Sequence, residues 1–100
     1  MVVVTAGMHG NEPGGILAMQ LVQQAFDQGD MHLKKGSILG LAGNLPALKE
    51  GVRFIQHDMN RVWITGQIND LQRHGLERAR WQEEIQAVEL MQEVEAWHQA

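Results

Sequence analysis

Cysteine is absent from the 100 residues of the chain. This absence excludes disulfide bonds, thiolate nucleophiles and cysteine ligands for zinc. It agrees with a reducing compartment, and we expect a cytoplasmic protein. No apolar stretch approaches the roughly 20 residues that span a bilayer, so we expect no membrane partner. The apolar start Met1–Ala6 lacks a basic flank, so we also expect no signal peptide.

Positive charge is also scarce, with 8 Lys and Arg residues against 12 Asp and Glu residues and a formal net charge of −4. No basic stripe runs along the sequence, which argues against nucleic acid as a partner. An anionic ligand would therefore be attracted by individual groups and not by the overall field. The hydrophobic fraction of 44% is ordinary for a globular protein, and the length leaves little room for a second domain.

Strand and helix patterns alternate along the chain and predict an α/β fold. The Val-rich run Met1–Thr5 predicts a strand covered on both faces, and Ser37–Ala42 predicts a second buried strand. A helix with one apolar face is expected between them, over residues 12–27. Residues 66–75 are predicted as a polar surface segment, and residues 77–97 as a long helix whose apolar stripe should pack on the sheet. The stripe consists of Trp81, Ile85, Val88, Met91, Val94 and Trp97.

The first candidate motif, Gly7-Met8-His9-Gly10-Asn11-Glu12, directly follows the first predicted strand. Open α/β sheets place ligands at this end of their strands. His9 and Glu12 stand three residues apart, and an imidazole and a carboxylate are two of the three protein ligands that a catalytic zinc commonly uses. The alternative is structural: the charge of Glu12 stabilises a helix N-terminus, and His9 is solvated.

The second candidate motif lies between Arg53 and Arg61 and contains Asp58-Met59-Asn60-Arg61. Guanidinium groups suit bidentate capture of carboxylates or phosphates, and the amide of Asn60 offers both a donor and an acceptor. Beside a metal, one arginine can polarise a carbonyl group while another anchors an anionic substrate. An ordinary cluster of surface ion pairs is the alternative interpretation.

Together with Asn44-Leu45-Pro46-Ala47, these motifs occur in an order and spacing that resemble the succinylglutamate desuccinylase/aspartoacylase family, a branch of the zinc carboxypeptidase-like hydrolases. The resemblance covers nearly the whole chain. It implies a partial zinc-carboxypeptidase-like α/β fold, with a mostly parallel or mixed sheet and flanking helices, truncated before the later strands. Residues 1–100 would then be the N-terminal part of one zinc-hydrolase catalytic domain.

The resemblance also implies a role for each matching residue. His9 and Glu12 match the first two ligands of a Zn²⁺ ion. Arg53 matches the catalytic arginine that polarises the scissile carbonyl group and stabilises the oxyanion. Asn60 and Arg61 match the pair that binds the substrate carboxylate.

Two further positions are expected to support the site. Asp58 matches an aspartate that orients a neighbouring arginine or a ligand, and Asn44 matches a turn near the site. The family's third zinc ligand, a histidine in an Asp-x-His segment, and its general base, a later glutamate, have no counterpart in the sequence. His98 stands at the end of the predicted helix, so we do not assign it as a ligand.

The implied function is zinc-dependent hydrolysis of the amide bond of an N-acyl amino acid or a similar small anionic amide. We expect the 100-residue chain by itself to be inactive and to be marginally stable or to self-associate through its truncated sheet edge. Two alternatives stay open. One is a non-catalytic remnant that binds a metal or a carboxylate, and the other is a carboxypeptidase-like peptidase.

Overall fold

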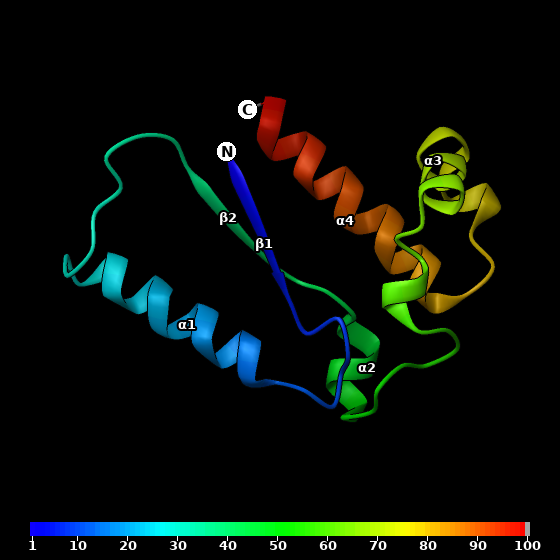
Figure 1. The fold of residues 1–100 in the computed structure, drawn as a ribbon, viewed down its shortest axis with the longest axis horizontal. Helices are drawn as coiled ribbons and strands as arrows, with labels where there is room; N and C mark the ends of the chain where they lie inside the picture. Colours follow the sequence, from blue (N-terminus) through cyan, green and yellow to red (C-terminus); the bar gives the residue numbers. More distant parts are fainter. Residues whose placement is uncertain (100) are drawn as a thin grey trace.

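A computed structural model describes residues 1–99 and shows an α/β chain, as the sequence pattern predicts (Figure 1). No helix among these residues is both long and apolar enough to cross a membrane. The elements in chain order are β1 (Val2–Ala6), α1 (Gly14–Asp27), β2 (Ile38–Ala42), α2 (Leu45–Glu50), the 3₁₀ turn η1 (Met59–Arg61), α3 (Thr65–His74), the 3₁₀ turn η2 (Gly75–Arg78) and α4 (Gln82–Gln99).

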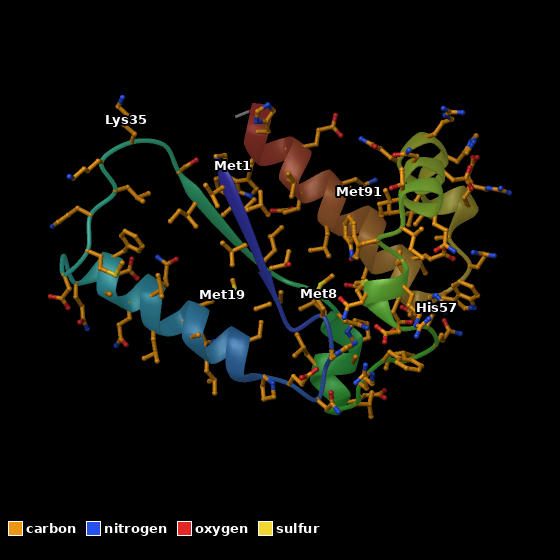
Figure 2. The ribbon with its side chains drawn as sticks, in the orientation of Figure 1. Met1, Met8, Met19, Lys35, His57 and Met91 are labelled. Atoms are coloured by element: carbon orange, nitrogen blue, oxygen red, sulfur yellow. The ribbon has the colours of Figure 1, made fainter. Side chains whose placement is uncertain are left out.

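The two strands pair in parallel, with a register that runs from Val2 opposite Ile38 to Ala6 opposite Ala42. Parallel strands need a crossover connection, and α1 provides it (Figure 1). Met19, labelled in Figure 2, lies on the side of α1 that faces the sheet, where its methyl group covers Gly40. The carboxyl ends of both strands therefore meet at one edge of the sheet, and the loops that follow them lie side by side.

The prediction that both strands are buried is wrong for this structure. Val2 is 60% exposed, Val4 is 42% exposed and Ile38 is 48% exposed. No residue of α1 is buried either, and Leu21 on this helix is 67% exposed. The Val-rich pattern is that of a fully covered sheet, but 100 residues provide too few elements to cover both faces of the strand pair.

The apolar core lies between α4, α3 and the end of η1 instead of over the sheet. Its buried members are Val62, Leu71, Ala87 and Val88, and Met91 packs against them. The prediction that the α4 stripe packs on the sheet is therefore wrong. A groove of about 820 Å³, lined by residues of both strands and of α4, separates this helix from the strand pair.

Helix boundaries near the core differ from the sequence prediction at two places. The long helix begins at Gln82, because residues 75–78 form η2. The segment predicted as polar surface forms α3, which has one buried side chain, Leu71. Its largely polar sequence carries too narrow an apolar face to distinguish a surface helix from a loop.

Candidate active site

The loop after β1 carries His9 and Glu12 and is held tightly by its neighbours. Gly7 has a φ of +72°, a left-handed conformation that favours glycine. A Cβ atom at Gly10 would collide with the main chain of Ala47 and Val52. The N–H of Gly10 also donates a hydrogen bond of 3.2 Å to the carbonyl oxygen of Arg53. The two candidate motifs therefore touch through their backbones, and this close approach requires glycine.

The imidazole of His9 joins the two motifs through its side chain. Its Nδ1 lies 2.8 Å from Oε2 of Glu12, and its Nε2 lies 2.9 Å from Oδ1 of Asp58. The His9 and Asp58 side chains are mostly buried, whereas the Glu12 side chain is 67% exposed. The amide Nδ2 of Asn60 lies 3.4 Å from the same Nε2 atom. Residues 49 positions apart in the sequence thus meet at one ring.

These contacts shift the protonation of both partners. The hydrogen bond to Asp58 raises the pKa of His9, the bond to Glu12 acts in the same direction, and burial opposes both. The hydrogen bond from His9 lowers the pKa of Asp58, although burial of the carboxyl opposes this. Asp58 is therefore ionised near neutral pH and fixes the orientation of the imidazole ring.

This arrangement suits a metal ligand. Metal-binding histidines commonly donate their second ring N–H to a carboxylate, which fixes the ring and raises the basicity of the ligating nitrogen. Asp58 lies at Nε2 of His9, so Nδ1 faces Glu12 and the two expected ligands point at each other. Asp58 lies at the opposite ring nitrogen, and within residues 1–99 no three His, Cys, Asp or Glu side chains are arranged so that they could hold a metal ion together.

Both arginines of the second motif lie at the surface, and Arg53 reaches the carboxylate beside this ring. The Nη2 atom of Arg53 is 3.5 Å from Oδ2 of Asp58, and 57% of the Arg53 side chain is exposed. Asp58 also begins η1 by accepting a hydrogen bond of 3.0 Å from the N–H of Asn60. Arg61 is the last residue of η1, is exposed and forms no ion pair with the rest of the described chain. The structure thus brings Arg53, Asp58 and Asn60 to His9 and leaves Arg61 facing solvent.

Asn44 lies directly behind the loop that carries His9 and is fully buried. Its backbone N–H donates to the carbonyl oxygen of Gly7 at 2.9 Å. Its side-chain Oδ1 accepts from the N–H of Ala47 at 3.4 Å and caps α2. Its Nδ2 donates to Glu83 at 2.8 Å. Asn44 therefore lies at a turn next to the candidate site, at the position that the sequence motif predicts.

Glu83 is a buried residue of this region that the sequence did not single out. Besides Asn44, its carboxylate accepts hydrogen bonds from three consecutive backbone N–H groups, those of Ile55, Gln56 and His57, at 2.8–3.0 Å. Burial raises the pKa of Glu83, but these four hydrogen bonds outweigh it and leave the pKa lowered. A glutamate in the first turn of a helix is ordinary in sequence, so no local pattern distinguishes it.

A histidine between two carboxylates, at the carboxyl edge of a parallel strand pair, defines an α/β protein with a candidate metal-binding active site. Residues 1–98 match the family model described as Succinylglutamate desuccinylase/Aspartoacylase catalytic domain. The chain belongs to this family, which confirms the resemblance that its motifs indicate.

Curated relatives carry the same family name. The chain is 41% identical over 62 residues to a succinylglutamate desuccinylase of Photorhabdus laumondii, an alignment that covers 61% of this chain and 18% of that protein. It is 34% identical over 61 residues to the enzyme of Pseudomonas fluorescens, again covering 61% of this chain and 18% of the relative. The chain thus spans less than a fifth of the length of these relatives. No solved structure matches it significantly.

Proposed function

We propose that the protein containing this chain is a zinc-dependent hydrolase that cleaves the amide bond of an N-acyl amino acid or a similar small anionic amide. Family membership supports the deacylase reaction. The observation that supports a metal centre is the His9 ring, oriented by Asp58 and directed at Glu12. The chain would be the N-terminal part of one catalytic domain with a zinc carboxypeptidase-like fold, acting in the cytoplasm.

His9 and Glu12 would hold the zinc ion together with a ligand from outside residues 1–99. A zinc ion in such a site polarises a carbonyl oxygen and lowers the pKa of bound water. Asp58 keeps the His9 ring in the orientation that leaves Nδ1 available on the Glu12 side. Because the third ligand and the general base are not among the described residues, residues 1–100 alone should not hydrolyse substrate.

Arg53 and the Asn60-Arg61 pair would bind the substrate on the solvent side of this centre. Arg53 extends an exposed guanidinium group beside Asp58, and this exposure supports a role as a hydrogen-bond donor to the developing oxyanion. Arg61 is exposed and forms no ion pair within residues 1–99, so its charge is available for a substrate carboxylate. The Nδ2 atom of Asn60 lies 3.4 Å from Nε2 of His9.

The test is an assay of the protein as its gene encodes it, after removal of metal with a chelator and after return of Zn²⁺. N-succinylglutamate, N-acylaspartates and short peptides are the substrates. The proposal predicts release of the free acid and the amino acid with Zn²⁺, and none in the chelated protein. Zinc binding without hydrolysis would instead support a binding remnant, and preference for peptides would support a peptidase.

A further inference from the structure

Glu83 has no role in the proposed reaction, yet it is fully buried and fully hydrogen-bonded. Its four donors come from two different parts of the chain. One is the side chain of Asn44 behind the His9 loop, and the other three are the backbone N–H groups of residues 55–57. The hydrogen bonds of the N–H groups of residues 55–57 are partly buried. A backbone N–H away from water needs an acceptor, and these residues lie in neither a helix nor a strand that would supply one.

Two further contacts fix the same segment to the start of α4. The side-chain Oε1 of Gln56 accepts a hydrogen bond of 2.8 Å from the N–H of Gln82. The ring of His57 stacks on Trp81, with 4.2 Å between ring centroids and 15° between planes. Figure 2 shows His57 beside the first turn of α4. The helix thus caps the segment through Glu83, and the segment caps the helix through Gln56.

These hydrogen bonds close a loop of contacts around the candidate site. From Glu83, one path runs through Asn44 to the carbonyl oxygen of Gly7, two residues before His9. The other path runs through the N–H of His57 to its neighbour Asp58, which contacts His9 at 2.9 Å. We propose that Glu83 is a positioning residue that sets the separation of the two motifs and so holds Asp58 against His9. Its effect on turnover rests on the proposed function, whereas its effect on the His9–Asp58 contact does not.

The chemistry of the site explains why a carboxylate is needed at position 83. An ionised carboxylate has about four acceptor positions and no donor, which matches four converging N–H groups. A glutamine has the same shape, but its NH₂ group would face two of these donors in either orientation, because each carboxylate oxygen accepts two of the four hydrogen bonds. Glu84 provides a natural comparison, because it is also buried, yet among the described residues it accepts from Arg80 alone, through the backbone N–H and Nε of that residue.

The experiment compares Glu83→Gln with the matched control Glu84→Gln in the protein as its gene encodes it. In chelator-treated protein, ¹⁵N and ¹H NMR would report the His9 ring and the amides of residues 55–57. Glu83→Gln should shift those amide protons upfield and remove the signature of the hydrogen bond between His9 and Asp58. With Zn²⁺ restored, kcat/KM should fall by about 10- to 100-fold, as for other residues that orient metal ligands. Glu84→Gln should change neither the ring signals nor kcat/KM by more than about twofold, because its hydrogen bonds go to Arg80 and not to Asn44 or to residues 55–57.

Unchanged His9 signals and unchanged kcat/KM in folded Glu83→Gln would overturn the proposal. If this variant does not fold, Asn44→Ser decides, because serine can still cap α2 but lacks the amide that reaches Glu83. In Asn44→Ser, a partial loss of the signature of the hydrogen bond between His9 and Asp58 would support the proposal. Wild-type His9 ring signals in this variant would overturn it. Absence of hydrolysis in the wild-type protein would count against the proposed function. The positioning role of Glu83 would then be tested by the His9 ring signals alone.

Discussion

At the scale of single residues, His9 combines both halves of the candidate site in one imidazole ring. Glu12 approaches it from the same loop, and Asp58 approaches it from a segment 49 residues away. Arg53 contacts Asp58 on the far side of that carboxylate. Each of these side chains therefore depends on a neighbour for its orientation. The roles of individual residues are best distinguished by measuring the effect of each substitution on substrate binding and on turnover independently.

Arg53→Ala should lower kcat by about 10²- to 10³-fold, the usual cost of losing one oxyanion donor, with a smaller change in KM. Arg61→Ala should instead raise KM for substrates with a free carboxylate, because it removes an anchoring charge. Steady-state kinetics of the zinc-loaded protein measure both quantities. Arg73→Ala, an exposed arginine of α3, is the control, and an Arg53→Ala variant with normal turnover would rule out the oxyanion role.

Glu83 should make stability depend on acid pH. Its folded pKa lies below the reference value of 4.5, so its stabilising contribution is complete above about pH 4.5 and is lost as the pH falls through the folded pKa. Glu83→Gln should therefore cost about 1–3 kcal/mol of unfolding free energy at pH 7, and less in acid. Urea unfolding of both proteins from pH 7 to pH 3 measures this difference, and a gap that stays constant with pH would contradict it.

At the scale of secondary-structure elements, the carboxyl ends of the two strands decide where the site lies. The N–H of Gly43 donates to the carbonyl oxygen of Ala6 at 2.7 Å, and that of Asn44 donates to Gly7 at 2.9 Å, so the pairing continues past both strands. This places the loop with His9 beside the start of α2. The candidate site thus adjoins the paired strands, although the expected ligands His9 and Glu12 lie in the loop after β1.

Gly10→Ala should destabilise the protein, because the new Cβ would collide with the main chain of Ala47 and Val52. The expected loss is about 1–3 kcal/mol, the usual cost of overpacking, and Arg53 should move away from His9. Gly14→Ala is a matched control, since a Cβ there meets no atom within 4 Å and alanine favours the helix. Urea midpoints compare the two, and equal stability of both variants would contradict the close approach.

At the scale of the whole molecule, residues 1–99 leave the apolar faces of the sheet and of α1 largely uncovered. Val2, Val4, Leu17 and Leu21 are all more than 40% exposed, and the core is formed instead by α3 and α4. Large amounts of exposed apolar surface mark a contact surface in soluble proteins. The 100 residues therefore resemble one side of a larger core.

Residues 1–100 expressed alone should self-associate through this surface. Sedimentation velocity should show species larger than a monomer whose share grows with concentration. The double substitution Val2→Lys and Val4→Lys places two charges on one face of β1 and should shift the distribution towards monomer. A monodisperse monomer at all concentrations, for the unsubstituted chain, would contradict the prediction.

The sequence by itself determined the local features of this protein. The strand–loop–helix order, the two expected ligands three residues apart and the capping Asn44 follow from short-range spacing and backbone preference, as do the motifs that mark the family. Only the tertiary structure decided which distant groups meet. Contacts of Asp58 with His9 and of Glu83 with residues 55–57 join segments separated by 49 and 26–28 positions. The packing of α4 on α3, and not on the sheet, was likewise decided there, because burial depends on which elements are present to share an apolar face and no local pattern encodes that.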